Sequence, residues 1–421
     1  MTGATDEPTI EQAAASEALG YDPFGPAAMI DPLPLYRALR DGYRAYPLPQ
    51  YDAVALPRFA DVWDVSRNRA DFSIVEGPVS HRERLLVHND GPPDRAPPDL
   101  RPTFSMLDPP RHTTLRGALA PAFTPGAIRR TEADMRAQAR ALLDELVPRG
   151  RFDVVRDLAA PIATAATCAQ LGLTDVDRPR ITALVNTFAR REGTVPGVSA
   201  DGQAAMAELA GMVVASVGAQ LASGDPSPVV AALAALEIDG RRLTEIEIVT
   251  QLTTMVIGGV ESLPKVMGGG ARLLAAHPDQ RAALVADPAG VPAAFEEILR
   301  LKVPLQFGTR TLVRDAAVAG ARLRAGQRVI LLYISANRDE REFPDPDRFD
   351  VTRRPERHLG FGTGVHFCIG AHAARLEGIV LLQELLARVP EWDVDDAGVE
   401  RLPSEFQIGD TAVPIDFATS A

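Results

Sequence analysis

Residues 358–377 read HLGFGTGVHFCIGAHAARLE, and this stretch is the most informative part of the sequence. Three glycines precede Cys368, and Gly370 follows it and opens a predicted helix that runs to about Ala387. Glycine permits positive φ angles and lets a flat ligand approach the backbone closely. A thiolate near a helix N-terminus is stabilised by the helix dipole and by backbone N–H groups. The stretch can therefore present an anionic sulfur to a metal.

Two other interpretations of these residues are open. One is a glycine-rich turn that carries a buried thiol. The other is a zinc site, because His366, Cys368 and His372 lie close together in the sequence. Structural zinc takes four ligands and often uses paired cysteines. The second cysteine, Cys168, lies 200 residues away in an alanine-rich predicted helix, where a buried structural thiol is expected.

The stretch resembles the cysteine loop of the cytochrome P-450 superfamily, whose pattern is F-G-x-G-x-H-x-C-x-G-x-x-x-A-R. The positions that match in register are Phe361, Gly362, Gly364, His366, Cys368, Gly370, Ala374 and Arg375. The resemblance implies the soluble bacterial type of this superfamily, with Cys368 as the axial thiolate of haem b. It also implies that Phe361, Gly362 and Gly370 contact this cofactor. Thiolate ligation of the iron favours cleavage of the O–O bond.

Glu297 and Arg300 lie one turn apart on a predicted helix, where their side chains can pair. A solvated pair is the alternative, because chance supplies this spacing often. In the superfamily such a pair is buried and is joined by an arginine from a P-x-R-F segment, which residues 346–349 match through Arg348. The resemblance implies that these side chains anchor the region behind the cysteine loop. Loss of one partner would leave a buried charge, which is costly.

His112 and Arg116 lie four residues apart at the start of another predicted helix and share one face of it. Bacterial members of the superfamily use this pair to bind the haem propionates, and Arg310 and His366 match further propionate contacts. Cationic and imidazole donors are the expected partners of carboxylates, and arginine supplies bidentate geometry. Taken singly, each of these residues is more often a surface residue.

The helix predicted over about 244–275 opens with a capping-box pattern at Thr244 and is apolar almost all round in its middle, which places it in the centre of the protein. The superfamily pattern there is A/G-G-x-D/E-T-T, and this chain has Gly259, Glu261 and Ser262 at the matching positions. We expect Glu261 and Ser262 to be catalytic in proton delivery and Gly259 to contact the cofactor. Serine keeps the hydroxyl but lacks the methyl group that restricts χ1. Pro264 predicts a kink and a freed carbonyl; a merely structural kink is the alternative.

Composition limits the other classes of function. The chain has 421 residues, 46% of them hydrophobic, a net charge of −12 and a pI of about 5.2. An acidic chain argues against non-specific binding to nucleic acid and against a basic membrane-surface protein. The N-terminus lacks the pattern of a signal peptide, and no stretch of about 18 uncharged apolar residues indicates a spanning helix. With two cysteines, a reducing cytoplasm is the expected location.

The organisation predicted from the sequence is a loosely ordered arm over residues 1–30, followed by one large domain over 31–421. Residues 75–105 are expected to be loop-like. Helices are predicted at about 125–146, 155–171, 176–190 and 200–222, in addition to those above. Strands are few, and are expected at 53–56, 310–313 and 328–333. The fold class is therefore mainly α with a small β region, which is the cytochrome P-450 fold that the resemblance implies.

The function implied by the resemblance is a haem-thiolate monooxygenase that inserts one oxygen atom of O2 into a small hydrophobic substrate, by hydroxylation or oxidative dealkylation. Electrons are expected from NAD(P)H through a reductase and a separate ferredoxin, because the chain has too few cysteines for its own iron–sulfur cluster. The alternatives are a haem-thiolate peroxygenase, a cyclising or coupling enzyme and, in a different class, a haem-based sensor. Glu261 and Ser262 favour oxygen activation.

The resemblance also predicts two surfaces. The substrate pocket should draw on residues 104–107, 255–259, 303–307 and 406–408, which are mostly apolar. The ferredoxin should dock on the cysteine-loop side, where a local basic patch would have to overcome the acidic charge of the whole chain. The candidates for this patch are Arg111, Arg116, Arg129, Arg130 and Arg375, of which Arg116 is expected to be occupied by a propionate.

Overall fold

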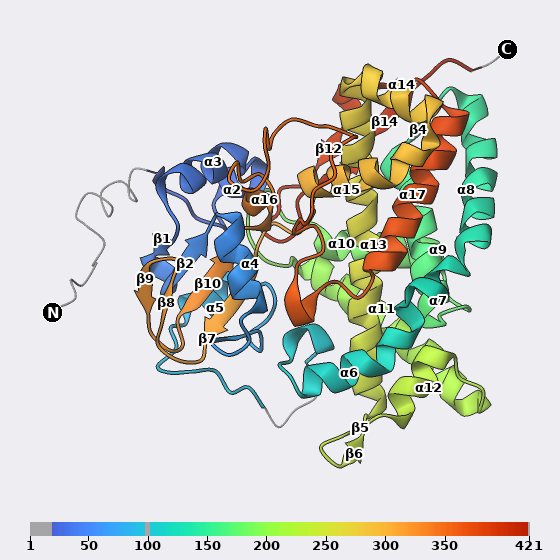
Figure 1. The fold of residues 1–421 in the computed structure, drawn as a ribbon. Coiled ribbons are helices and arrows are strands. Elements are labelled where there is room, and N and C mark those ends of the chain that lie inside the picture. Colours follow the sequence, from blue (N-terminus) through green and yellow to red (C-terminus); the bar gives the residue numbers. More distant parts are fainter. Residues whose placement is uncertain (1–18, 97–101, 420–421) are drawn as a thin grey trace.

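A long helix, α13 (Glu245–Ala276), passes through the centre of the helical part of the protein (Figure 1). The structure is a computed structural model that describes residues 19–96 and 102–419. The helix begins with the predicted capping box. Thr244 Oγ1 accepts a hydrogen bond from the Glu247 N–H at 3.4 Å, and the Glu247 carboxylate accepts one from the Thr244 N–H at 2.8 Å. Two N–H groups that a helix start leaves unpaired are thereby satisfied.

The other α-helices surround α13 and extend to the side of the molecule that carries the main sheet. They are α2 (Pro26–Ile30), α3 (Leu33–Gly42), α4 (Phe59–Arg67), α5 (Arg82–Leu86), α6 (Arg111–Leu119), α7 (Pro125–Arg129), α8 (Glu132–Leu146), α9 (Ala160–Leu171), α10 (Arg178–Ala189), α11 (Ala200–Ser223), α12 (Pro228–Ala235), α14 (Pro278–Ala286), α15 (Val291–Leu301), α16 (Tyr333–Ala336) and α17 (Ala371–Arg388).

The strands of the described residues form a five-stranded sheet of order β1-β2-β10-β7-β3, on the left in Figure 1, and smaller sheets. In the main sheet only the β2–β10 pairing is parallel. The strands are β1 (Tyr46–Leu48), β2 (Ala53–Leu56), β3 (Phe72–Ser73), β4 (Arg151–Asp153), β5 (Glu237–Ile238), β6 (Arg241–Arg242), β7 (Gly308–Leu312), β8 (Ala316–Val318), β9 (Ala321–Leu323), β10 (Arg328–Leu331), β11 (Asp393–Val394), β12 (Glu400–Arg401), β13 (Asp410–Ala412) and β14 (Pro414–Asp416).

The predicted class, mainly α with a small β region, is confirmed. The strand predicted at 53–56 is β2, and those predicted at 310–313 and 328–333 overlap β7 and β10. The helix predicted at 200–222 is α11, and the one opened by Gly370 is α17. All three predicted strands lie in the main sheet.

The three consecutive glycines of α13, for which the sequence pattern offers no reason, allow close packing. A Cβ at Gly268 would lie 2.6 Å from Val155 Cγ2, and one at Gly269 would lie 2.8 Å from the Lys302 side chain. A Cβ at Gly270 would lie 3.1 Å from Ile298. These glycines therefore let the segment before α9 and the helix α15 approach the axis of α13, and close packing offsets their low helix propensity.

Two predicted helices are less regular than expected. The helix predicted over 125–146 is interrupted between α7 and α8, because Thr131 donates its hydroxyl to the Ile128 carbonyl at 2.8 Å and so competes with the helical pattern. The helix predicted over 155–171 starts with a wider π-helical segment, η5 (Val154–Ala159). Pro161 then lacks the N–H that a regular α-helical bond would need.

The loosely ordered arm predicted over residues 1–30 is only partly tested. Residues 1–18 lie outside the described residues. The prediction is wrong for the later part, because Tyr21 and Phe24 are buried, with exposed fractions of 2% and 4%, and α2 follows them. Phe24 packs edge-to-face on Tyr51 and on Phe307. Aromatic burial of this kind outweighs the polar, small-residue composition on which the expectation rested.

One feature of α11 was not expected from the sequence. By length and composition alone, this helix is long and apolar enough to cross a membrane, with a mean hydropathy of 1.5. Its buried residues Leu209, Val213 and Val217 recur with helical spacing and belong to the core that includes Leu252 and Val256 of α13. Helices of this composition also occur on the core of water-soluble domains.

Candidate active site

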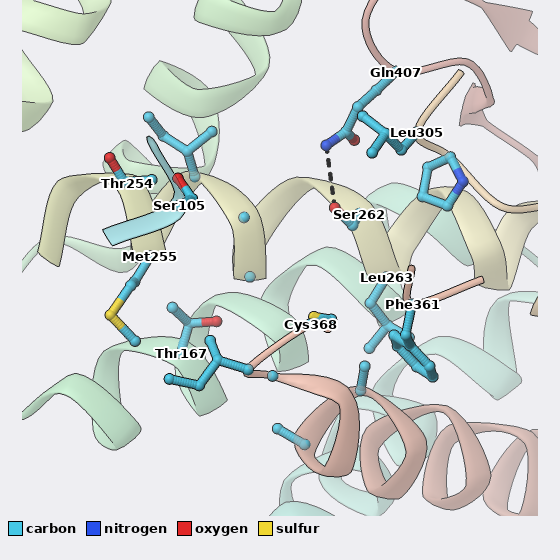
Figure 2. A pocket seen from close by; sticks show the side chains of 18 of the residues that line it. Ser105, Thr167, Thr254, Met255, Ser262, Leu263, Leu305, Phe361, Cys368 and Gln407 are labelled. Carbon is cyan, nitrogen blue, oxygen red and sulfur yellow. Dashed lines mark hydrogen bonds between the residues drawn. The ribbon is translucent and has the colours of Figure 1, made fainter. Parts of the chain in front are cut away.

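The cysteine loop holds Cys368 just before α17 and opposite α13, as Figure 2 shows. The Cys368 N–H donates to the Phe361 carbonyl at 3.0 Å, which closes the loop upon itself. Gly364 has a φ of 75°, and a Cβ at this position would lie 2.8 Å from the Ser66 carbonyl oxygen. A side chain is therefore excluded at Gly364, both by backbone conformation and by the close approach of α4.

The thiol of Cys368 is accessible from an internal cavity and is otherwise enclosed by protein. Burial raises the pKa of Cys368, while the backbone N–H of Gly370 and the charges of Arg116 and Arg375 lower it. Burial is the largest of these effects, so the pKa of Cys368 is raised overall, and a bound metal cation would favour the thiolate. The other cysteine, Cys168, is fully buried in α9, and burial raises its pKa to about 11, so the predicted structural thiol is confirmed.

The cavity has a volume of about 740 Å³ and lies between α13, α9 and the cysteine loop. Each of the four segments predicted to line a substrate pocket contributes to its wall. The contributors are Phe104, Ser105, Met255, Ile257, Gly258, Gly259, Val303, Pro304, Leu305, Phe406 and Gln407. The ends of these segments, Leu107, Phe307 and Ile408, are buried in the core instead. The wall is thus mostly apolar, with a few polar groups.

Imidazole and guanidinium groups gather at one edge of the cavity, where His366, Arg116 and Arg310 line it and His112 packs against His366. The imidazole rings of His112 and His366 lie 4.2 Å apart between centroids, and both nitrogens of the buried His112 lack a hydrogen-bond partner in the structure. Burial and the nearby Arg116 lower the pKa of His112 to about 4. Burial, followed by the charge of Arg310, lowers the pKa of His366 to about 2. A buried polar group without a partner is unusual and points to a missing ligand.

Arg116 and Arg310 lie at the same edge of the cavity and are not paired with a carboxylate within residues 19–96 and 102–419. Arg116 Nη2 donates to the Phe367 carbonyl at 2.6 Å, and Arg310 Nη1 donates to the Thr309 carbonyl at 2.7 Å. Two guanidinium groups and two imidazoles therefore converge on a space with no anion among the described residues. A flat ligand with two carboxylates, as haem has, fits this donor set and the cavity beside Cys368.

The glycines predicted to contact a cofactor differ in their surroundings. Gly362 and Gly370 line the cavity beside Phe361, on the cysteine side. Gly259 also lines the cavity, but a Cβ there would lie 2.3 Å from Thr167 Oγ1, so this glycine allows α9 to pack against α13. The preceding residue, Gly258, has no atom within 4 Å of a Cβ position and leaves open space.

Ser262 and Glu261 lie on different sides of α13. Ser262 lines the cavity, and its Oγ accepts a hydrogen bond from Gln407 Nε2 at 3.2 Å (Figure 2). Glu261 is buried and does not line the cavity. Its Oε1 forms an ion pair with Lys265, and its Oε2 is buried without a partner. The structure therefore separates the two residues that the sequence presented as a polar pair.

The sequence interpretation missed Lys265, and it placed Gln407 in the predicted pocket segment 406–408 without its contact to Ser262. Lys265 is buried at 5% exposure, four residues after Glu261, and the i,i+4 spacing of opposite charges could have revealed it. Gln407 comes from a segment 145 residues after Ser262, and its side chain gives no signal in the sequence. The helix itself continues through Pro264.

The predicted ion pair of Glu297 and Arg300 is present and buried, but the arginine that joins it is not the predicted one. Arg300 binds Glu297 through two hydrogen bonds of 2.7 and 2.8 Å, and both side chains are fully buried. The arginine that joins them is Arg353, whose Nε lies 3.1 Å from Glu297 Oε1. The prediction of Arg348 is wrong: this residue is exposed, because the adjacent Phe349 takes the inward direction and packs in the core.

The basic residues predicted to receive an electron donor are only partly available. Arg111 pairs with Asp239 at 2.6 Å, and Arg375 binds Glu296 at 2.6 Å and lies over the Phe361 ring. Burial raises the pKa of Glu296, but hydrogen bonds from His358 and Arg375 lower it to about 2 overall. Arg129 and Arg130 are exposed and form no ion pair in the described part of the chain.

The zinc interpretation is not supported by the side-chain arrangement. His366 lines the cavity with Cys368, whereas His372 is exposed on α17. Within the described ranges, no three His, Cys, Asp or Glu side chains gather as ligands of a metal ion would. The open geometry around Cys368 instead suits a metal whose other ligands come from a cofactor.

The fold and the site together define a mainly helical protein in which the thiol of Cys368 faces a long central helix across a large cavity. A family model described as Cytochrome P450 matches residues 291–409. The chain is 35% identical over 381 residues to Cytochrome P450 130 of Mycobacterium tuberculosis, covering 88% of this chain and 91% of that protein. The chain belongs to the cytochrome P450 family and is an oxidoreductase of the P450 monooxygenase class.

Two further similarities bear on the family. Steroid C26-monooxygenase of Mycobacterium tuberculosis is 33% identical over 330 residues, which cover 76% of this chain and 87% of that protein. The structure of cytochrome P450 CYP109Q5 from Chondromyces apiculatus superposes with a TM-score of 0.79 at 29% identity and covers 95% of this chain and 99% of that chain. The predicted cytochrome P450 fold is thereby confirmed.

Proposed function

We propose that this P450 binds haem b through Cys368 and inserts one oxygen atom of O2 into a small hydrophobic organic substrate, by hydroxylation or oxidative dealkylation. The observation that carries the proposal is the thiol of Cys368 at a cavity beside which two guanidinium and two imidazole donors gather, with both nitrogens of His112 lacking a hydrogen-bond partner in the structure. Those donors, His112, Arg116, Arg310 and His366, would bind the two propionates. When bound, haem supplies the oxygen-activating chemistry.

The chain's own residues then have separate tasks. Cys368 provides the anionic ligand, and the Gly370 N–H and nearby arginines stabilise its charge. Phe361, Gly362 and Gly370 form the wall beside it. On the opposite wall, the hydroxyl of Ser262 can hold a proton at the cavity surface. Glu261, held by Lys265 behind the wall, is the acid that would resupply this proton.

The apolar wall supports a hydrophobic substrate. Phe104, Met255 and Phe406 line the cavity together with other apolar side chains, and polar side chains such as Ser105 and Thr254 are available to orient a ligand. One relative of this chain is named a steroid C26-monooxygenase, which is compatible with an apolar substrate of that size class. A titration of the haem spin state against a compound library would identify substrates of this chain.

We further propose that NAD(P)H supplies electrons through a ferredoxin reductase and a ferredoxin, and that residues 31–421 act as one haem-thiolate domain in the cytoplasm. Arg129 and Arg130 are exposed cations without an ion pair to a described residue, and a docking patch near α6 can be based on them. The acidic charge of −12 makes a local basic patch necessary for an acidic donor, and also disfavours nucleic acid and membrane surfaces as partners.

The alternatives within the family are a peroxygenase and a cyclising or coupling enzyme. A haem-based sensor is the alternative from a different class of protein. The decisive experiment combines the purified holoenzyme with ferredoxin, reductase, NAD(P)H and isotopically labelled O2 in the presence of a substrate found by titration. A monooxygenase gives product with one labelled oxygen atom in proportion to NAD(P)H consumed. Three outcomes would contradict the proposal. They are a product that forms with hydrogen peroxide but not with NAD(P)H and O2, a cyclised product without labelled oxygen, and no product at all.

A further inference from the structure

We propose that Gln407 is a positioning residue for Ser262, which it fixes so that the serine hydroxyl donates its proton into the cavity. The inference rests on the proposed oxygen-inserting function and assigns a role to a residue outside α13. It starts from the contact between Gln407 Nε2 and Ser262 Oγ, at 3.2 Å, across the wall of the cavity (Figure 2). Both residues line the cavity, and Gln407 has an exposed fraction of only 7%.

The backbone of Gln407 is held firmly. Its N–H donates to Ser404 Oγ at 3.3 Å, and residue 407 pairs with Leu305 in an isolated antiparallel bridge. On either side of it, the Gln306 N–H donates to the Phe406 carbonyl at 3.0 Å and the Ile408 N–H donates to the Pro304 carbonyl at 2.8 Å. The segment behaves like a short strand, so the side chain of residue 407 is directed at α13 by the backbone.

Glu405, two residues before Gln407 in the same segment, is also anchored. Glu405 binds Arg191 Nε at 2.9 and 3.0 Å and accepts a hydrogen bond from the Gly197 N–H at 3.2 Å. Both side chains of this ion pair are nearly fully buried, with exposed fractions of 3% and 4%. Breaking such a pair is costly, so the segment has little freedom to leave α13.

Lys265 determines which way the amide of Gln407 points. An ammonium group only donates, so the amide atom that faces it must be the oxygen. Gln407 Oε1 lies 3.5 Å from Lys265 Nζ, at the long limit of a hydrogen bond but within electrostatic reach of the cation. The amide nitrogen is then left for Ser262, to which it can only donate. The orientation of the amide therefore follows from the charge of Lys265.

The position of Lys265 is in turn set by Glu261. The Lys265 ammonium group forms a buried ion pair with Glu261 Oε1, which lies one turn earlier on α13. In addition, a Cβ at Gly409 would lie 2.8 Å from Lys265 Cβ, so the lysine stem is packed tightly by the segment that carries Gln407. The four side chains thus form one ordered series: Glu261, Lys265, Gln407 and Ser262.

The consequence concerns the proton of Ser262. A hydroxyl has one donor, and here its oxygen already accepts from Gln407. The hydroxyl makes no second hydrogen bond to a described residue, so its proton is free for a group in the cavity. In the superfamily pattern a threonine stands at this position, and its methyl group restricts χ1. Gln407 supplies the restriction that serine lacks.

Three variants test this inference. Gln407→Leu removes the donor, and Gln407→Glu replaces it with an acceptor of nearly the same shape. The carboxylate would accept the Ser262 proton and turn it away from the cavity. Product formed per NAD(P)H should fall about threefold to tenfold in both variants. This is the change in rotamer population that the loss of one neutral hydrogen bond would cause. Peroxide release should rise as product formation falls.

The rescue variant is Ser262→Thr, combined with Gln407→Leu. The added methyl group should restore most of the lost coupling, because it restricts the rotamer by itself. A control is Gln327→Leu, which removes a 2.7 Å hydrogen bond to Asp52 outside the cavity and should leave coupling at the wild-type value. If Gln407→Leu fails to fold, Gln407→Glu with and without Ser262→Thr carries the test.

A structural readout separates the inference from the enzyme's activity. In a crystal structure of the holoenzyme, wild-type Ser262 should occupy one rotamer with Oγ facing residue 407, and Gln407→Leu should show several rotamers. An unchanged single rotamer in Gln407→Leu, or full coupling in Gln407→Glu, would overturn the role of Gln407. Failure of the wild-type holoenzyme to form product with NAD(P)H would instead overturn the proposed function.

Discussion

The rings of His112 and His366 lie 4.2 Å apart between centroids and are tilted by 53°, and neither nitrogen of His112 has a hydrogen-bond partner in the structure. His112 is 2% exposed. Leaving a buried donor or acceptor unsatisfied costs about 1–3 kcal/mol. A ligand that supplies an anionic acceptor at this place would remove the cost. This contact therefore links the fold directly to cofactor binding.

The first prediction is a pH dependence of the stability of the haem-free protein. Burial lowers the pKa of His112 to about 4, from an ordinary value of 6.5. Between these values the unfolded chain binds a proton that the folded chain does not bind, so folding stability should fall as the pH is lowered from about 6.5 to about 4. A propionate beside His112 would favour its charged form. Haem loading should therefore make the fall shallower.

Urea denaturation of the haem-free and haem-loaded protein at pH 7 and pH 5 measures this difference. His112→Asn should reduce the pH dependence of the haem-free protein, whereas the same change at the exposed His88 should not. Equal pH dependence with and without haem would show that no propionate reaches His112.

The second prediction distinguishes two arginines near the buried Glu297–Arg300 pair. Arg353→Leu removes a partner of Glu297 at 3.1 Å and leaves a fully buried carboxylate with one cation fewer. Its free energy of unfolding should fall by about 3 kcal/mol, as is typical when one member of a buried charge cluster is lost. Arg348→Leu changes an exposed residue and should alter stability by less than about 0.5 kcal/mol. Equal losses in chemical denaturation would refute the assignment of Arg353.

The third prediction concerns neighbouring glycines of α13. Gly259→Ala places a methyl group 2.3 Å from Thr167 Oγ1 and should destabilise the protein by about 1–3 kcal/mol through overpacking. Gly258→Ala meets no atom within 4 Å and should gain up to about 1 kcal/mol from helix propensity. Adding Thr167→Ala should recover much of the loss in Gly259→Ala. If the two glycine variants change the thermal stability by the same amount, the close approach of α9 to α13 at Gly259 is contradicted.

The fourth prediction concerns electron transfer. Arg129→Glu with Arg130→Glu reverses two exposed cations near the cysteine loop and should slow the encounter with an acidic ferredoxin at low salt. The gap to wild type should narrow as salt rises, because the Debye length shrinks to about 8 Å at 0.15 M. Stopped-flow reduction at two ionic strengths measures this, with substrate-induced spectral change as the control. No difference at either salt concentration would mean that the donor docks elsewhere.

Local patterns in the sequence predicted a large part of the site. The cysteine loop, the capping box at Thr244 and the pairing of Glu297 with Arg300 all depend on spacings of a few residues, and the structure has each of them. The strand predicted at 53–56 was correct for the same reason, because a run of apolar residues bounded by turns is a local signal.

Contacts between distant segments could not be predicted in this way. Gln407 reaches Ser262 from a segment held by residues 304–306, and Arg353 replaces Arg348 because a turn directs Phe349 inward. The burial of Tyr21 and Phe24 likewise depends on aromatic partners far along the chain. Such contacts are determined by tertiary packing, which overrides local composition.

The most direct test of the central claim is the absorption spectrum of the reduced carbon monoxide complex. Wild-type protein loaded with haem should show the strongly red-shifted Soret band that a thiolate ligand produces, and Cys168→Ser should keep it. Cys368→His should lose that band while still binding haem, because the donors at the cavity edge remain. A red-shifted band that survives in Cys368→His, or that disappears in Cys168→Ser, would contradict the assignment of Cys368 as the haem ligand.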